Sequence, residues 1–266
     1  MAGIPGLAQS LRFVQPCSLS SHPSSCPPSV FLPASKSLSS RLFRSSRSLS
    51  QGSVRVTVPR GAASASARSA ATYEFAEDIG QILGEVSVFA ATGESVMFKD
   101  LWDQNQGIAV VALLRHFGCP CCWELASNLK ESKARFDSAG VKLIAVGVGS
   151  PDKARMLAER LPFPMECLYA DPDRKAYDVL GLYYGFGRTF FNPASAKVFS
   201  RLDSLKQATK NYNIEATPDD RSGVLQQGGM FVFKGKQLLY ARKDEGTGDH
   251  APLDSIYNVC CKVPAA

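Results

Sequence analysis

Three cysteines lie close together in the segment Cys119-Pro120-Cys121-Cys122. The continuous apolar run before them, Ile108 to Arg115, predicts a strand buried on both faces, and the spacing after them predicts a helix from about Pro120 to Ser138. The first turn of a helix presents unpaired N–H groups and the positive end of the helix dipole, which favour a thiolate over a thiol. Because the thiolate is the reactive form of cysteine, this junction predicts thiol redox chemistry.

Cys119 and Cys122 have the spacing of a CxxC redox motif and are close enough on a helix to form a disulfide. Cys122 shares a helical stripe with Ala126, Leu129 and Phe136, so we expect it to face the core. Cys119, at the very start of the helix, is expected to be the exposed attacking sulfur. This arrangement is typical of a dithiol oxidoreductase.

Three neighbours of this cysteine pair, Arg115, His116 and Cys121, have different expected roles. Arg115 is a candidate catalytic residue that adds positive charge, although alternation along the strand places only one of Arg115 and His116 near the sulfur. Cys121 is expected to point elsewhere, and no disulfide with its neighbour Cys122 is expected, since it would be strained.

Other interpretations of the cysteines remain open. Zinc usually takes four ligands in two separated pairs, and the only histidines after residue 72 are His116 and His250, so we expect no metal. Cys167 and Cys260 are interpreted as ordinary buried residues, and Cys261 as a surface thiol or a resolving partner. The sequence has no glycine-rich phosphate loop of the dinucleotide type, so we expect no organic cofactor.

Strands and helices alternate over residues 73–181, which predicts an α/β domain with parallel central strands. A later hairpin over Met230–Ala241 and a helix with Leu253, Ile256 and Cys260 on one face complete the order of a thioredoxin-like fold, a central mixed sheet flanked by helices. Besides the strand and helix at the cysteines, the predicted elements are a short helix near residues 75–83, a hairpin over Val86–Ala90 and Ser95–Phe98, strands at Val141–Val148 and Met165–Ala170, and helices from Ser150-Pro151 and from Asp171-Pro172 to Gly181.

Residues 182–226 are predicted to form a helical insertion before the late hairpin. A helix is expected over 193–208, with Val198, Leu202 and Leu205 at helical spacing, and we interpret it as packing this stripe on the sheet. The alternative is a lid over Cys119 that selects an apolar or lipid peroxide. The aromatic residues of that lid would be Tyr183, Tyr184, Phe186, Phe190 and Phe191.

The first 72 residues differ sharply in composition from the rest of the chain. They contain no Asp or Glu, 19 Ser and eight basic residues, whereas the remaining 194 residues hold 22 Lys and Arg against 24 Asp and Glu. The formal net charge of +6 therefore belongs to this segment, which argues against a nucleic-acid-binding protein. The longest wholly apolar run, Ile108 to Leu114, is far shorter than the roughly 20 residues of a membrane helix, so we expect no membrane span.

This composition predicts that residues 1–72 are a disordered chloroplast transit peptide and that residues 73–266 form the thioredoxin-like domain, located in the stroma. Pro5 and Pro16 work against the amphipathic helix of a mitochondrial leader. The alternative is a disordered basic tail that binds RNA or membrane.

The sequence resembles the peroxiredoxin-like family of AhpC/TSA antioxidant-domain proteins, including its plant chloroplast thioredoxin-like members. The resemblance implies a thioredoxin fold and a thiol-based antioxidant or reductase role, with Cys119 and Cys122 at the CxxC positions. Its segments are Phe98–Trp102, Arg115–Cys119 with Cys122, Tyr169–Arg174, Gln227–Val232 and Asp249-His250.

The sequence departs from true peroxiredoxins at several positions. Their Pro-x-x-x-Thr-x-x-Cys pattern would place proline and threonine where this chain has Ala112 and His116. Gly228-Gly229 occupy the corner where peroxiredoxins place a second arginine, and the turn lacks the proline that thioredoxins keep opposite the CxxC. We therefore predict a thiol-disulfide oxidoreductase or a weak peroxidase rather than a fast one.

The sequence as a whole predicts a chloroplast redox protein that cycles a Cys119–Cys122 dithiol. Its partners would be a peroxide or protein disulfide substrate and an external thiol reductant of the thioredoxin or glutathione type. The competing hypothesis is a non-enzymatic binding module or redox sensor with the same fold.

Overall fold

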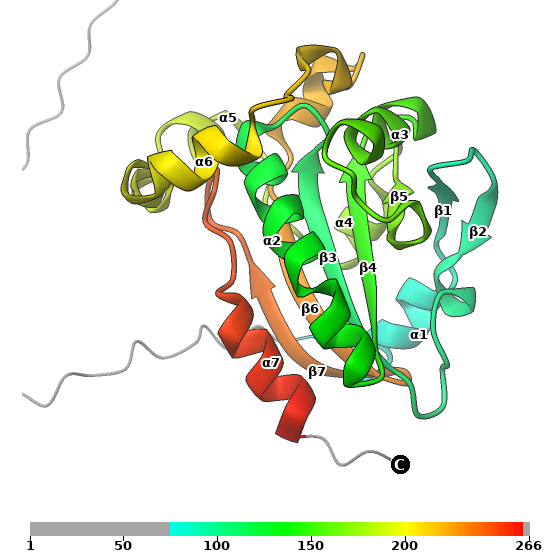
Figure 1. Ribbon diagram of the computed structural model, residues 1–266. Helices are drawn as coiled ribbons and strands as arrows, with labels where there is room; N and C mark the ends of the chain where they lie inside the picture. The colour runs from blue at the N-terminus through cyan, green and yellow to red at the C-terminus, as the bar shows by residue number, and fades with distance from the viewer. Residues whose placement is uncertain (1–74, 263–266) are drawn as a thin grey trace, which may run out of the picture. The chain divides into compact units, whose positions relative to one another are not determined.

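The computed structural model describes residues 75–262, with side chains to Cys260, so the expected leader lies outside the described residues. The described chain folds around a seven-stranded sheet in the order β2-β1-β5-β4-β3-β6-β7 (Figure 1). The strands are β1 (Ser87–Ala90), β2 (Ser95–Met97), β3 (Ile108–His116), β4 (Val141–Val148), β5 (Leu168–Ala170), β6 (Gly229–Lys234) and β7 (Gln237–Lys243).

The three central strands β3, β4 and β5 are parallel, and all other neighbouring strands pair antiparallel. This is the mixed sheet of a thioredoxin-like fold, as the alternating sequence pattern predicted. β3 is buried along almost its whole length because helices cover both faces of the sheet. Its register against β4 shifts between Leu113 and His116, where the strand approaches the cysteines.

Helices divide between the two faces of the sheet. The core on one face includes residues of α2 (Pro120–Ser138), α3 (Pro151–Arg160) and α7 (Leu253–Lys262), and the core on the other includes α1 (Ile79–Gly84) and α4 (Lys175–Val179). α2 and α7 lie side by side (Figure 1), where the rings of Phe136 and Tyr257 stack at 4.7 Å. None of the helices within residues 75–262 combines the length and the apolar character needed to cross a bilayer.

Two predicted boundaries were wrong. The strand expected from Met165 to Ala170 is shorter, because residues 165–167 form a 3₁₀ turn (η2) closed by the N–H of Cys167 on the carbonyl of Pro164 at 3.0 Å. The helix expected from Asp171-Pro172 begins only at Lys175, because Arg174 takes a left-handed conformation with φ of 61°. The Asp171 carboxylate still caps this helix, accepting the N–H groups of Lys175 and Ala176 at 3.1 and 2.8 Å.

The segment from 182 to 226 consists of short helical pieces whose two ends lie together. Tyr184 and Gln226 form an isolated bridge, and the N–H of Gln227 donates to the carbonyl of Tyr183 at 2.9 Å. The segment therefore returns the chain to the start of β6. Its elements are α5 (Phe186–Phe190), η3 (Pro193–Arg201), α6 (Leu202–Ala208), η4 (Ile214–Ala216) and η5 (Arg221–Leu225).

The single helix expected over 193–208 is instead a 3₁₀ stretch followed by α6, with Arg201 at φ −124° between them. α6 packs against α2 rather than on the sheet, so that interpretation was wrong. Val198 and Leu205 are half-buried against the core, but Leu202 is 46% exposed because the break rotates it off the stripe.

Candidate active site

The turn between β3 and α2 is held from two sides. Tyr212 donates its hydroxyl to the carbonyl of Gly118 at 2.7 Å, and Trp123 donates its indole N–H to the carbonyl of Phe117 at 2.6 Å. Gly118 lies so close to Thr217 that a Cβ there would overlap the backbone and hydroxyl of that residue. Glycine is therefore required where the strand turns into the cysteine-bearing helix.

Cys119 is the N-cap residue of α2, with the extended backbone angles φ −90° and ψ 119°. Its carbonyl accepts the N–H groups of Cys122 and Trp123 at 2.9 and 3.2 Å, and Pro120 occupies the first helical position, where an N–H is not needed. The residue is only 2% exposed, so the expectation of an exposed sulfur was wrong. Tyr212 and Thr217 lie against Gly118 just before the helix start, and such contacts between distant parts of the sequence leave no pattern within the helix.

Arg115 supplies a fixed positive charge to this sulfur. Its Nη1 donates to Cys119 Sγ at 3.5 Å, while Nε donates to the carbonyl of Gln226 at 3.0 Å and Nη2 to the carbonyl of Val224 at 2.7 Å. The residue is 3% exposed, so the guanidinium acts in a region of low dielectric where its charge is poorly screened. The sequence predicted that one of Arg115 and His116 lies near the sulfur, but the two carbonyls that hold Arg115 lie 109 and 111 residues later in the chain.

The surroundings of Cys119 favour its thiolate. Hydrogen bonds from the thiols of Cys121 and then Cys122 hold the pKa of Cys119 well below its ordinary value; burial opposes them, and the charge of Arg115 adds to them. Burial lowers the pKa of His116, so its imidazole is neutral near pH 7 and Arg115 is the lasting positive charge. The geometry therefore joins an anionic sulfur to two thiol donors and a guanidinium.

The two partner thiols stay protonated. The hydrogen bond to Cys119, with burial, raises the pKa of Cys121. Burial, with the same kind of hydrogen bond, raises the pKa of Cys122 well above its ordinary value, and the sulfur also accepts the N–H of Arg115 at 3.2 Å. Cys122 is fully buried, as its helical stripe predicted.

Cys121 was expected to point away from this pair, and that expectation was wrong because its thiol donates to Cys119. Helical spacing does not apply between the two residues, since Cys119 has extended backbone angles and only Pro120 onward is helical. The cluster is thus three sulfurs rather than two.

Behind Cys121 lies a buried Asp244–His250 pair. His250 Nδ1 is 3.0 Å from Asp244 Oδ2, and its Nε2 is 3.1 Å from the carbonyl oxygen of Cys121. Burial opposes the charged imidazole, but the attraction of the Asp244 carboxylate outweighs it and raises the pKa of His250. The pair therefore holds a proton between its members and ties the loop before α7 to the start of α2.

Sequence reasoning missed several of these supporting groups. Gln226 and Gln227 link the insertion to the site. The carbonyl of Gln226 accepts a hydrogen bond from Arg115, and the Gln227 amide donates to the hydroxyl of Thr189 at 2.9 Å. Gln227 and His250 belong to segments that carried the family resemblance, which is the one available signal for them. Nothing in the sequence distinguished Asp244.

Within residues 75–260, the structure contains no group of three or more His, Cys, Asp or Glu side chains arranged to hold a metal ion. Cys119, Cys121 and Cys122 all carry thiols rather than disulfides in this structure. The structure therefore describes the three cysteines without a disulfide bond.

The sheet order and the cysteines at the strand-to-helix junction define the class of thioredoxin-like redox proteins. Residues 128–246 match the family described as AhpC/TSA antioxidant enzyme. The chain is 36% identical over 182 residues to the thioredoxin-like protein AAED1, chloroplastic, of Arabidopsis thaliana, covering 67% of this chain and 71% of that protein. The chain belongs to the peroxiredoxin-like family of AhpC/TSA proteins.

Two further similarities extend the comparison. The chain is 32% identical over 185 residues to prostamide/prostaglandin F synthase of Bos taurus, covering 67% of this chain and 86% of that one. The crystal structure of peroxidoxin BcpB from Mycobacterium tuberculosis matches with a TM-score of 0.46 and 14% identity over 67% of this chain and 93% of that one. The segment that matches the family begins after Cys122, so the roles of the cysteines are argued from their geometry.

Proposed function

We propose that this protein is a thiol-dependent reductase in which Cys119 is the nucleophile and Cys122 the resolving thiol. The observation that carries the proposal is the guanidinium of Arg115, fixed by two carbonyls and 3.5 Å from Cys119 Sγ, beside two thiol donors. These surroundings lower the pKa of Cys119 and so favour the thiolate, which is the nucleophilic form of cysteine.

The proposed cycle has three steps. The Cys119 thiolate attacks one oxygen of a peroxide, so that an S–O bond forms, the O–O bond breaks, and the other oxygen leaves as an alcohol or water after taking up a proton. The Cys122 thiol then attacks the sulfenic acid, releasing water and forming a Cys119–Cys122 disulfide. An external thiol reductant returns two electrons and two protons to the pair.

Burial of Cys119 favours a small peroxide over a protein disulfide as the oxidant. A protein disulfide must bring its own sulfur into line with the attacking one, which a residue 2% exposed does not permit without a conformational opening. The absence of threonine at position 116 removes the hydroxyl that true peroxiredoxins aim at the peroxide, so the reaction is expected to be slow for that class. The proposal is a weak peroxidase.

We further propose that the protein works in the chloroplast stroma after removal of residues 1–72. The acid-free, serine-rich composition of that segment supports import, and the Arabidopsis relative is described as chloroplastic. A fluorescent protein fused after residue 72 should enter plastids in leaf cells. The same fusion with residues 1–72 deleted should remain in the cytosol.

The chemistry can be tested by single-turnover oxidation with peptide mapping. Trypsin releases residues 116–130 as one peptide that holds all three cysteines. Reduced protein is treated with equimolar hydrogen peroxide, quenched with N-ethylmaleimide after seconds to minutes, and fragmented. The peptide should contain one disulfide and one alkylated cysteine, and the alkylated residue should be Cys121.

Matched variants sharpen this result. A Cys121→Ser protein should still form the internal disulfide, and a Cys119→Ser protein should form none. Alkylation on Cys122 instead would make Cys121 the resolving thiol. If all three cysteines are still alkylated after minutes of peroxide treatment, the proposal of an enzyme is wrong and the hypothesis of a binding module or slow redox sensor is favoured.

A further inference from the structure

A recess of about 310 Å³ opens beside the second turn of α2. Glu124 and Asn128 of α2 form one side, Arg201 at the end of η3 forms another, and the loop carrying His250 and Pro252 closes it. This volume falls at the lower end of the range for small-ligand sites. None of these side chains has a part in the cycle proposed above.

In the recess, the Glu124 carboxylate accepts no hydrogen bond from the described residues, and Arg201 is only partly satisfied, because its Nη2 donates to the carbonyl of Gly248 at 2.7 Å while its Nε has no acceptor. Glu124 is 1% exposed, yet neither of its carboxylate oxygens accepts a hydrogen bond. Arg201 Nη2 is 3.6 Å from Glu124 Oε2, and Arg201 Nε is buried without an acceptor. Burying a charge without hydrogen bonds destabilises the fold. A ligand that hydrogen-bonds to the Glu124 oxygens and to Arg201 Nε would therefore bind favourably.

The unpaired hydrogen-bonding groups of Glu124 and Arg201 indicate the chemistry of that ligand. The Glu124 carboxylate requires a positively charged N–H donor, and the Nε of Arg201 requires an anionic oxygen. The two groups are adjacent, so their complement carries an ammonium and a carboxylate on neighbouring atoms, as a free α-amino acid group does. Leu125 and Leu253, also in the recess, offer apolar contact for the methylenes beyond it.

Two residues that line the recess, Arg201 and His250, connect it to Cys121. Cys121 Sγ and Arg201 Nη2 lie 3.3 and 3.5 Å from the same point, the position that a side chain on Gly248 would occupy. His250 lines the recess and contacts the carbonyl of Cys121. All three cysteines are buried, so a thiol in the recess reaches the cluster only when the structure opens locally.

We propose that this recess binds the free α-amino acid end of a small thiol peptide of the glutathione type, with its ammonium on Glu124 and its carboxylate on Arg201. The inference rests on the proposed function and names the class of reductant that serves it. A thiol peptide anchored at that end has its sulfur on the side of Cys121, next to the oxidised pair. Its thiolate attacks one sulfur of the Cys119–Cys122 disulfide to form a mixed disulfide, and a second thiol peptide attacks that mixed disulfide, so that two peptide thiols are oxidised and the pair is reduced.

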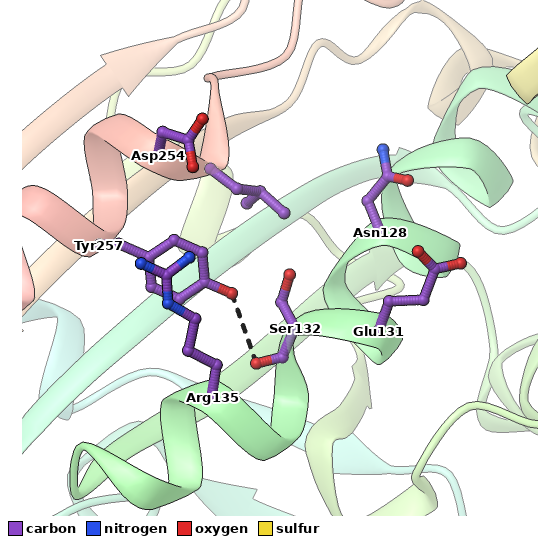
Figure 2. A pocket seen from close by; sticks show the side chains of 7 residues that line it. Asn128, Glu131, Ser132, Arg135, Asp254 and Tyr257 are labelled. Atoms are coloured by element: carbon purple, nitrogen blue, oxygen red, sulfur yellow. Dashed lines mark hydrogen bonds between the residues drawn. The ribbon is translucent and has the colours of Figure 1, made fainter.

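An adjoining groove provides the contrast and the control. It is about 400 Å³ in volume, lies between α2 and α7, and shares Asn128 and Leu253 with the recess (Figure 2). Its carboxylates, Glu131 and Asp254, are exposed to solvent and carry no buried charge that a ligand must complete. Glu131 is therefore the matched control for Glu124 on the same helix.

The test uses S-methylglutathione, which keeps the α-amino acid group but cannot exchange disulfides. Calorimetric titration into the reduced protein should show saturable binding with one site. N-acetylation of the same peptide removes the ammonium and should weaken binding about ten-fold or more. Glu124→Gln and Arg201→Gln should weaken it to a similar extent, whereas Glu131→Gln should bind as the unsubstituted protein does.

Two results would overturn the proposal: no saturable binding to the unsubstituted protein, or equal binding of the peptide and its N-acetyl form. The second comparison needs no variant, so it decides even if Glu124→Gln does not fold. Failure of the proposed function is separate, because a Cys119→Ser protein should still bind S-methylglutathione. Peroxide turnover of the unsubstituted protein with dithiothreitol as reductant tests the function without using the recess.

Discussion

The two ends of α2 carry polar side chains in opposite circumstances. At the N-terminal end the three cysteines are buried beside Arg115 of β3, whose guanidinium is fixed by two backbone carbonyls. Toward the C-terminal end, Glu131 and Arg135 face solvent, and Arg135 lies 3.6 Å from the centre of the Tyr257 ring (Figure 2). A charge alters the chemistry of a neighbour only where solvent does not screen it, so one helix has a reactive end and an inert one.

The largest effect is expected from Cys119→Ser. Replacing the thiolate by a hydroxyl should lower peroxide turnover by about a thousand-fold or more, since serine stays protonated without a base to activate it. Peroxide consumption with dithiothreitol measures it. Cys167→Ala is the control, because burial raises the pKa of Cys167 to about 11 and its thiol takes no part. Equal losses in both variants would contradict the assignment.

Arg115→Gln removes the positive charge that distinguishes the N-terminal end of α2 from the C-terminal end. Without the guanidinium the pKa of Cys119 should rise, and its alkylation rate at neutral pH should fall about ten- to a hundred-fold. The rate of iodoacetamide labelling against pH gives the shift directly. Arg160→Gln, on the exposed end of α3, should leave the profile unchanged; an unchanged profile in Arg115→Gln would remove this arginine from the site.

Gly118→Ala tests the tight turn that begins the reactive end. The added methyl overlaps Thr217, so the free energy of unfolding should fall by about 1–3 kcal/mol in urea titrations. Gly187 in α5 has no atom within 4 Å of the equivalent position, so Gly187→Ala should be neutral or mildly stabilising. A fully stable Gly118→Ala protein would show that the turn can relax.

The cysteines should also make stability depend on pH. The pKa of Cys119 in the folded protein lies below its ordinary value of 9.0, so the unfolded chain binds more protons between the two values. Unfolding free energy should therefore rise with pH up to about 9, by at most about 1.4 kcal/mol per pH unit, relative to Cys119→Ser. Above pH 9 the raised pKa values of Cys121 and Cys122 act in the opposite direction. Urea unfolding from pH 6 to 10 under reducing conditions measures both slopes.

The smallest effect is expected at the inert end. Arg135→Ala removes one cation–π contact with Tyr257 and should lower the unfolding free energy by about 0.5–1 kcal/mol. Its labelling profile at Cys119 should match that of the unsubstituted protein. A shift in that profile would mean that charge acts along the helix and that the two ends are not independent.

Periodicity recovered most of the framework, because buried strands and amphipathic helices have distinct spacings. The limits of β3, α2 and β4 follow from the apolar run and from Gly140, which has φ of +68° just beyond α2. Local backbone choices were harder. Arg174 in the left-handed region and Arg201 at the break before α6 are set by tertiary contacts, which a propensity does not contain.

Residue types predicted a thiol site at this junction, whereas the burial of that site left no signal in the sequence. Residue type and spacing singled out Cys119 and Cys122 as candidates and placed one of Arg115 and His116 near the sulfur. The burial of Cys119 and the turn of Cys121 toward it depend on segments more than 90 residues away, such as Tyr212 on the carbonyl of Gly118. Contacts of that sequence separation leave no local pattern.

The anchoring of Arg115 has a consequence for a chain that is still being made. Its guanidinium is held by the carbonyls of Val224 and Gln226, 109 and 111 residues later. Until that part of the polypeptide has been synthesised and has docked, nothing fixes the charge beside Cys119. In the nascent chain Cys119 therefore lacks this positive charge, and the environment that favours its thiolate is complete only when residues 224–226 have docked.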